Sequence, residues 1–354
     1  MKSPLDKIRP EVRGLSQYTL EQYRYEIKIN QNENPFDIPV HLKDQVMELA
    51  RDRSWARYPD FVPRDFQQKL AHYVRWDPEG ILVGNGSNEL IRSVLMVSIE
   101  KGSRVVIPVP TFTLYKLMST LFGADVIEVK LNTDYTFNTE ALREAAEDAD
   151  LLILSSPNNP TGCVITDENL RLLLQNTDAL VLVDEAYCEF SGTSCLPLLK
   201  SYKNLIILRT FSKAFSLAGL RVGYLIADPL LTREIAKAKL PYDLNFFSQM
   251  AAMKVLENIM IIKERIKYII AQREILYETL QQIPGVTPYP SHANFILFET
   301  ILDAKYLFSK LLEHGVLVRD VSSYPMLAKA LRVTVGKEEE NKRFVRALTD
   351  IMSL

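Results

Sequence analysis

The sequence predicts an α/β protein with a mostly parallel central sheet and helices on both faces of that sheet, followed by a smaller α+β domain. Two observations predict this architecture. From about residue 40 to residue 230, short apolar runs of strand length alternate with segments of helical periodicity. Several of these runs are apolar on both faces, as the strands of a buried parallel sheet are. Strands that alternate with helices in this way are typical of a doubly wound fold.

The same patterns divide the chain into three predicted parts. Residues 1–40 are rich in proline, asparagine and charge, and we expect them to form an N-terminal arm. Residues 41–247 are expected to form the large α/β domain. A long helical stretch begins near residue 246, and we expect residues 248–354 to form the small C-terminal α+β domain.

The predicted elements follow in chain order. Helices of the large domain are expected over 41–53, 64–74 and 88–99. Its strands are expected at the apolar runs 81–83, 104–109, 126–129, 151–154, 179–183, 205–208 and 222–227. In the small domain, one helix from about 246 to 282 is followed by strands at 295–298, 316–319 and 331–335 and by helices at 303–313 and 337–352.

Composition and charge argue against several classes of protein. The chain has 354 residues, 47% of them hydrophobic, and 42 Lys and Arg against 44 Asp and Glu give a net charge of −2. This balance indicates no general attraction to nucleic acid or to anionic membranes. No apolar run approaches the ~20 residues of a membrane helix, and the first ten residues lack the apolar core of a signal peptide.

Cysteine and histidine usage indicates a reducing compartment and no metal site. The three cysteines, Cys163, Cys188 and Cys195, are an odd number without metal-ligand spacing. Cys188 and Cys195 are interpreted either as a pair or as small buried side chains, and we favour the second. We therefore expect a cytoplasmic protein. The four histidines are scattered and receive no metal-binding and no catalytic role.

Polar, turn-forming motifs follow directly on five of the predicted strands. They occupy residues 84–89, 110–115, 155–162, 184–187 and 210–213. Ligands of open α/β sheets bind beyond the carboxyl ends of the strands. Any one of these motifs has a purely structural explanation, but the set of five predicts that they converge on one ligand.

The last of these motifs holds Lys213, which follows an apolar strand and lies among Ser and Thr residues. Lysine forms Schiff bases with carbonyl compounds and with pyridoxal 5′-phosphate (PLP) when its amine is neutral enough to attack. The alternative is an ordinary solvated lysine in a surface loop. Arg221 follows eight residues later, just before the next apolar run.

The motif at 84–89 opens a predicted helix at Gly86, Ser87 and Asn88. Glycine lets a ligand approach the backbone closely, and the free N–H groups at the start of a helix favour an anion such as phosphate. The alternative is a plain N-cap, in which Ser87 or Asn88 satisfies the first turn.

Asp184 ends a fully apolar strand, where an unpaired carboxylate would be costly. A cationic partner is therefore expected. We consider two candidates, a protonated pyridine nitrogen of a cofactor and a neighbouring arginine.

Five further side chains keep two interpretations each. Asn159 and Tyr187 are either contacts of a phenolic oxygen or ordinary turn and buried residues. Phe112 is either a stacking platform or part of the core. Arg319 and Arg332, on predicted strands of the small domain, are either a fork for an anionic substrate group or edge-strand charges that discourage aggregation.

Three of the quoted segments together carry a family resemblance. Ser-Pro-Asn-Asn-Pro-Thr-Gly, Asp-Glu-Ala-Tyr and Thr-Phe-Ser-Lys-Ala-Phe-Ser-Leu-Ala-Gly-Leu-Arg, in this order and at this spacing, resemble fold-type-I PLP-dependent aminotransferases. The resemblance covers nearly the whole chain, and the Ser-Lys segment is highly specific to that superfamily. Within it, Tyr18, residues 32–35, residues 57–60 and the strands around Arg319 and Arg332 are similar to the histidinol-phosphate aminotransferase subfamily.

The resemblance implies a role for each matching residue around the cofactor ring. Lys213 would form the Schiff base with PLP and then move a proton at the substrate. Asp184 would keep the pyridine nitrogen protonated. Tyr187, counted with these two as catalytic, and Asn159 would contact the 3′-oxygen of the ring. Phe112 would stack on the ring face, where relatives often carry tyrosine.

The resemblance also implies two anion sites and a second subunit. The cofactor phosphate would be held by Gly86, Ser87, Thr210, Ser212, Arg221 and, from the neighbouring subunit of a homodimer, Tyr58. Asn88 is also counted among the cofactor-binding residues. The substrate would be bound by Asn159, Arg319, Arg332 and the neighbour's Tyr18. The isomer of the Asn159–Pro160 peptide bond is left open.

The implied reaction is the transfer of an amino group from histidinol phosphate to 2-oxoglutarate in histidine biosynthesis, by a ping-pong mechanism. Two alternatives share the motifs, an aminotransferase for aromatic amino acids and an enzyme similar to threonine-phosphate decarboxylase. A PLP-binding regulator without turnover would be expected to carry an added DNA-binding segment, which is not evident. A nucleotide-binding α/β protein is disfavoured, because the phosphate-loop motif G-x-x-x-x-G-K-[ST] is absent from the sequence.

Overall fold

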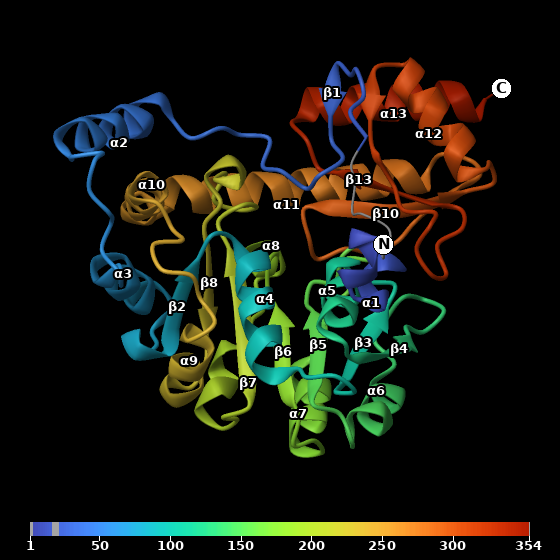
Figure 1. Cartoon of the computed structure of the whole chain (residues 1–354). Helices are drawn as coiled ribbons and strands as arrows, with labels where there is room; N and C mark the ends of the chain where they lie inside the picture. The colour runs from blue at the N-terminus through green and yellow to red at the C-terminus, as the bar shows by residue number, and fades with distance from the viewer. Residues whose placement is uncertain (1–2, 16–20, 354) are drawn as a thin grey trace.

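The computed structural model describes residues 3–15 and 21–353 (Figure 1). Within these ranges the chain builds a seven-stranded sheet in which one strand, β8, is antiparallel to both of its neighbours. The mostly parallel sheet predicted from the sequence is thereby confirmed. In spatial order its strands are β2 (Ile81–Gly84), β8 (Gly223–Ile226), β7 (Leu205–Thr210), β6 (Leu180–Asp184), β5 (Leu151–Ser155), β3 (Arg104–Val109) and β4 (Asp125–Lys130).

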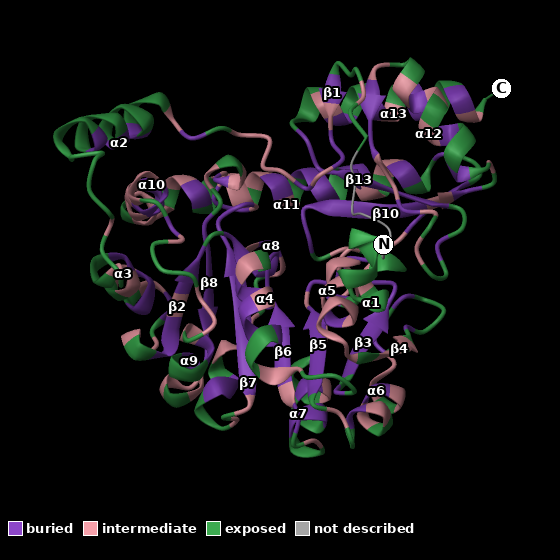
Figure 2. Cartoon of the chain, in the orientation of Figure 1, coloured by how far each residue is buried: buried purple, intermediate pink, exposed green. Residues whose placement is uncertain are grey.

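Helices cover both faces of this sheet. On one face, α4 (Ser87–Ser98), α5 (Leu114–Phe122) and α9 (Pro229–Ala236) share a core with Leu151 and Ile153 of β5. On the other face, the core contains Leu152 and Leu154 of the same strand together with residues of α3 (Arg64–Val74), α6 (Thr139–Ala146), α7 (Asp167–Gln175) and α10 (Phe246–Glu257). Successive side chains of a strand point to opposite faces, so a strand covered on both faces must be apolar throughout. Figure 2 shows these central strands buried and the outer sides of the helices exposed.

The topology brings the polar strand-end motifs to one edge of the sheet. Strands β2, β3, β5, β6 and β7 run in the same direction, so their carboxyl ends meet at that edge. Because β8 runs the opposite way, the residues just before it, Arg221 among them, lie at this edge too. The order of strands therefore accounts for the convergence that the sequence predicts.

A second, antiparallel sheet lies C-terminal to the large one. Its strands, in spatial order, are β12 (Arg319–Asp320), β13 (Ala330–Thr334), β10 (Phe295–Thr300) and β9 (Val286–Pro288). The helices of this part are α11 (Ile259–Gln281), α12 (Ala304–Glu313) and α13 (Glu338–Met352). The N-terminal segment contacts this C-terminal part as well, because β1 (Ile27–Lys28) pairs in parallel with β11 (Val316–Leu317) in a separate two-stranded sheet.

The remaining helices are short, except for α2, which has 13 residues. They are α1 (Pro10–Arg13), α2 (Val40–Asp52), α8 (Cys188–Ser191) and the 3-10 helices η1 (Pro4–Lys7), η2 (Pro78–Gly80), η3 (Leu196–Lys200) and η4 (Ala218–Leu220). No helix in the described part of the chain has both the length and the apolar character needed to cross a membrane. The peptide bond Asn159–Pro160 is cis.

Two elements predicted as continuous are each divided in two in the structure, so these predictions are wrong. The helix expected from 246 to 282 is two helices, because Asn258 leaves the helical conformation between α10 and α11 (φ −113°, ψ 34°). The strand expected at 316–319 is divided between β11 and β12, which belong to different sheets. Periodicity alone did not show either break, since apolar residues continue across both.

The division of the chain at residues 247 and 248 stays a prediction. Helix α11 contributes Ile262 and Ile269 to the core on the large sheet, whereas Leu276 and Leu280 belong to the core of the small sheet. This helix therefore runs along both cores and joins them.

Candidate active site

A cavity of about 430 Å³ lies at the carboxyl edge of the large sheet. It is lined by strand ends of that sheet, by β12 and β13 of the small sheet and by residues 30–32 of the N-terminal segment. Most of the residues predicted from the sequence meet here, namely Asn88, Phe112, Asn159, Asp184, Tyr187, Thr210, Ser212, Lys213, Arg221, Arg319 and Arg332.

Lys213 follows β7 and extends its amine into this cavity. The amine donates a hydrogen bond to the backbone oxygen of Gln31 at 2.8 Å. Burial, together with the positive charges of Arg332 and Arg221, lowers the pKa of Lys213 to about 7. A large fraction of the amine is therefore neutral near pH 7, which is the form that attacks a carbonyl carbon or accepts a proton.

Asp184, the last residue of β6, is buried at the floor of the cavity. Its carboxylate accepts hydrogen bonds from the Tyr115 hydroxyl at 2.8 Å and from the Ala186 backbone N–H at 3.0 Å. Burial raises the pKa of Asp184 to about 6, although both donors act to lower it. None of the ion pairs within residues 3–15 and 21–353 includes Asp184, so a cationic group of a ligand would find its charge unopposed here.

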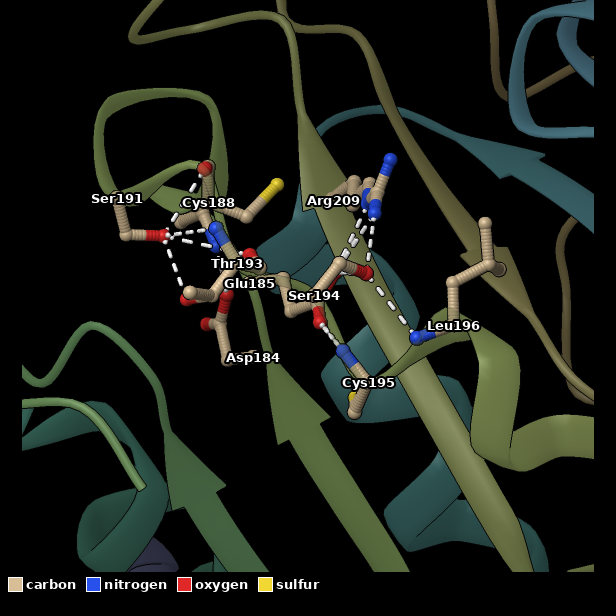
Figure 3. Close-up of polar contacts among 10 residues, drawn as sticks. Asp184, Glu185, Cys188, Ser191, Thr193, Ser194, Cys195, Leu196 and Arg209 are labelled. Atoms are coloured by element: carbon tan, nitrogen blue, oxygen red, sulfur yellow. Dashed lines mark hydrogen bonds and ion pairs between the residues drawn. The ribbon is translucent and has the colours of Figure 1, made fainter. Parts of the chain in front are cut away.

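A neighbouring arginine does form an ion pair at this strand end, but with Glu185 and not with Asp184. Glu185 forms a buried ion pair with Arg209 of β7, at 2.8 Å between Nη2 and Oε2. Figure 3 shows this pair, with Ser194 bonded to both members. The neighbouring-arginine interpretation of Asp184 is therefore wrong, because adjacent residues at the strand end point to different surroundings.

A candidate anion site lies at the start of α4. Gly86 adopts φ +80°, and a Cβ there would come within 2.4 Å of Nη2 of Arg221. The same guanidinium donates from Nη1 to the Ser212 hydroxyl at 3.1 Å, and Thr210 and Ser212 are joined by a hydroxyl hydrogen bond of 3.0 Å. Gly223 lies so close to the backbone nitrogen of Ser87 that a Cβ would approach it to 2.4 Å. Glycine at both positions lets a helix start, two hydroxyls and an arginine meet in one place.

The two arginines of the small sheet lie opposite one another. Arg319 of β12 and Arg332 of β13 are cross-strand partners, and both line the cavity. Like charges in directly opposed positions repel, so an anion between them would stabilise both. Arg332 also donates to the backbone oxygen of Asn30 at 2.7 Å and to the side-chain oxygen of Asn159. The edge-charge interpretation does not account for Arg332, which is buried.

Three predicted residues with described positions do not line this cavity. Gly86 and Ser87 lie at the start of α4, where Gly86 contacts the cavity residue Arg221. Tyr58 is 78% exposed and stacks on Tyr242, with 4.5 Å between the ring centroids. The sequence predicts that Tyr58 enters the site of the neighbouring subunit, and this role stays a prediction. Tyr18 lies outside the described residues.

Several lining residues were not assigned a role from the sequence. Tyr115 bonds to Asp184, and Asn30, Gln31 and Asn32 form one wall beside Lys213. Tyr324 completes the lining next to the small sheet. A signal for Tyr115 was present, since it closes the strand-end motif at 110–115. For residues 30–32 the amide-rich composition indicated only a turn.

The comparisons with known proteins agree with this geometry. The model of the aminotransferase class I and II family matches residues 25–348. The chain belongs to this family. It is 40% identical over 345 residues to the histidinol-phosphate aminotransferase of Chlorobaculum tepidum, covering 96% of this chain and 99% of that protein. It is 39% identical over 350 residues to the protein of the same name from Caldanaerobacter subterraneus subsp. tengcongensis, covering 98% and 99%.

Solved structures of aminotransferases share the fold. The histidinol-phosphate aminotransferase of Clostridium acetobutylicum has a TM-score of 0.86 and 27% identity, over 92% of this chain and 99% of that one. The Sinorhizobium meliloti enzyme of that name, solved in complex with pyridoxal 5′-phosphate, has a TM-score of 0.88 and 24% identity, over 98% of each chain. The predicted fold-type-I architecture is thereby confirmed.

The cavity of this aminotransferase fits PLP, the cofactor of the family. PLP requires a lysine amine for covalent attachment, a carboxylate for its pyridinium nitrogen and an anion site for its phosphate. Lys213 and Asp184 would supply the first two, with no competing ion pair on Asp184 among the described residues. The Gly86–Arg221 contact, whose geometry leaves no room for a Cβ, would supply the third.

Proposed function

We propose that the protein transfers the amino group of histidinol phosphate to 2-oxoglutarate, producing imidazole-acetol phosphate and glutamate in histidine biosynthesis. The observation that carries this proposal is the opposed pair Arg319 and Arg332 in the same cavity as Lys213. A pair of guanidinium groups suits a phosphate, which accepts several charge-assisted hydrogen bonds. The names of relatives that are about 40% identical over nearly their whole length support the same substrate.

Several residues of the cavity have a part in this proposed reaction. When bound, PLP supplies the electron sink that makes the α-proton of the amino substrate removable. Lys213 would hold PLP covalently and, as a neutral amine, would be the base that takes this proton and delivers it on the cofactor side of the substrate nitrogen. Asp184 would keep the pyridine nitrogen protonated, and the Tyr115 hydroxyl, which donates a hydrogen bond to Asp184, would hold that carboxylate in place.

The second half of the reaction uses the same groups in reverse with 2-oxoglutarate. One anion site must then bind the phosphate of the first substrate and the distal carboxylate of the second. Arg319 and Arg332 suit both, because a guanidinium fork matches phosphate and carboxylate oxygens.

Tyr187 and Asn159 are proposed to contact the ring oxygen of the cofactor, and Phe112, at the cavity wall, to stack on the ring.

We propose that two copies of the chain form a homodimer with shared sites. Tyr58 is exposed in a single chain, together with Trp55 and Phe61. Exposed aromatic side chains that gather on one surface are typical of an interface. Tyr58 and the arm residue Tyr18 are proposed to enter the site of the partner.

A reducing cytoplasm suits Cys188 and Cys195, which are buried and carry no disulfide.

The substrate profile tests this function. We expect the kcat/KM for histidinol phosphate, with 2-oxoglutarate as acceptor, to exceed that for phenylalanine or for threonine phosphate by at least about 10²-fold, because a site built for a given polar group rejects substrates that leave its own groups unpaired. Assays of keto product and of released CO₂ separate transamination from decarboxylation. A preference for phenylalanine, or CO₂ release from threonine phosphate as the main activity, contradicts the proposal.

Replacement of Arg332 tests the anion site. Arg332→Ala is expected to lower kcat/KM for histidinol phosphate by about 30-fold to several thousand-fold while PLP content stays near one per chain, because loss of one charge-assisted partner costs about 2–5 kcal/mol. Arg332→Lys keeps the charge but not the fork and should recover part of the loss. Arg346→Ala on α13, an exposed position, is the control. Loss of PLP with an unchanged KM would place Arg332 at the cofactor instead.

A further inference from the structure

Asn32 lies where three parts of the chain meet at the cavity wall. It follows β1, it is 1% exposed, and its backbone adopts φ +55°, a left-handed conformation that asparagine tolerates better than most residues. Its backbone N–H donates to the Thr334 hydroxyl at 2.9 Å, and its backbone oxygen accepts from the Asn294 amide at 3.1 Å. Asn32 is thus held in position by the small sheet.

These contacts determine how the Asn32 amide is oriented. The Thr334 hydroxyl accepts the backbone N–H of Asn32, so its own proton is available for the side-chain oxygen of Asn32, which lies 3.0 Å away. With that oxygen engaged, the NH₂ group faces the opposite side. There it donates to the hydroxyl oxygen of Tyr187 at 2.9 Å.

The hydrogen bond from Asn32 determines which role the Tyr187 hydroxyl plays. Tyr187 accepts from Asn32, so its own proton must point elsewhere. No hydrogen bond within residues 3–15 and 21–353 has Tyr187 as its donor, and the residue lines the cavity. The ring is packed edge-on against Phe295, with 5.2 Å between centroids. Burial raises the pKa of Tyr187 to about 12, so the phenol keeps this proton near pH 7.

We infer that Asn32 is a positioning residue that orients the Tyr187 hydroxyl so that its proton is directed at the ring oxygen of the cofactor. The inference rests on the proposed function, in which Tyr187 contacts that oxygen. It assigns Asn32 no contact with substrate. Thr334 acts through Asn32, and because Thr334 lies two residues after Arg332 on β13, the same strand serves both the cofactor side and the substrate side of the cavity.

The visible absorbance of the bound cofactor reports on this arrangement. A donor on the ring oxygen withdraws negative charge from it, and this disfavours the protonated form of the nitrogen that joins Lys213 to the cofactor. When the Tyr187 hydroxyl no longer points at the ring oxygen, the pKa of that nitrogen should rise. This pKa is measured from the change of absorbance with pH. We expect a rise of about one pH unit or more for Asn32→Ala, since a hydrogen bond to a charged oxygen is worth about one to two pKa units.

Asn32→Asp is the second variant and covers the case in which Asn32→Ala does not fold. Aspartate has nearly the same shape and also tolerates the left-handed conformation, but its second oxygen accepts the Tyr187 proton instead of donating to the phenol. A rise at least as large as in Asn32→Ala is expected. Thr334→Val should give a smaller rise in the same direction. Asn34→Ala is the matched control. Asn34 lies in the same segment as Asn32, but its amide donates to the backbone oxygen of Ala214 and not to Tyr187.

A double-mutant cycle with Tyr187→Phe separates positioning from a general structural role. If Asn32 acts through Tyr187, Asn32→Ala adds no further shift in the Tyr187→Phe background. Equal shifts in both backgrounds, or titrations of Asn32→Ala and Asn32→Asp that match the starting enzyme, contradict the inference. An unmodified protein that binds no PLP and transfers no amino group would instead reject the proposed function.

Discussion

Lys213→Ala is expected to abolish transamination, with kcat falling by at least about 10⁴-fold. The amine has two roles in the proposed reaction, covalent attachment of PLP and proton transfer at the substrate, and loss of a proton-transfer group alone costs about 10²–10⁴-fold. The structure supports both roles, because burial brings the pKa of Lys213 to about 7 and the amine lies in the same cavity as Asp184. Steady-state assays at saturating PLP measure the loss.

Borohydride reduction adds a chemical measurement to the Lys213 prediction. Reduction should fix PLP to a single peptide that contains Lys213, and Lys213→Ala should give no adduct. Lys203→Ala is the control, because the Lys203 side chain is 71% exposed and pairs with Asp228. An adduct of equal yield in Lys213→Ala would show that another lysine carries the cofactor.

Asp184→Ala is expected to have the second largest effect, weaker PLP binding and slower proton removal. Truncating one partner of a buried charged pair costs about 2–5 kcal/mol, which corresponds to about 30-fold to several thousand-fold in kcat. Stopped-flow absorbance follows removal of the α-proton, and equilibrium dialysis measures the Kd of PLP. Far-ultraviolet circular dichroism checks that the fold is kept.

Two comparisons sharpen the Asp184 prediction. Asp184→Asn keeps the shape but removes the charge, so it should share most of the kinetic loss. Tyr115→Phe removes the 2.8 Å hydrogen bond but leaves the carboxylate, so its loss should be smaller. Near-normal turnover in Asp184→Ala would remove this residue from the mechanism.

The large sheet was predictable because burial on both faces leaves a simple signature. Strands β5, β6 and β7 are apolar at nearly every position, and each ends at a polar motif. The break at Asn258 was not predictable in the same way. It depends on α10 and α11 each finding separate packing surfaces, and no glycine or proline marks it.

The candidate site was predictable as far as its residues lie at strand ends. Lys213, Asp184 and Asn159 follow apolar runs, and the parallel topology brings them together. The role of residues 30–32 was not predictable, because it depends on contacts with residues about 150 to 300 positions away, such as Tyr187 and Thr334. The cross-strand register of Arg319 and Arg332 likewise depends on how β12 pairs with β13.

The half-reaction with amino donor alone tests the central claim most directly. Enzyme loaded with PLP is mixed with histidinol phosphate in the absence of 2-oxoglutarate, and the absorbance of the cofactor and the keto product are measured. We predict one equivalent of imidazole-acetol phosphate per site, loss of the starting absorbance, and its return with one equivalent of glutamate when 2-oxoglutarate is added. Continued product formation without an acceptor, or no absorbance change with histidinol phosphate, would contradict the account.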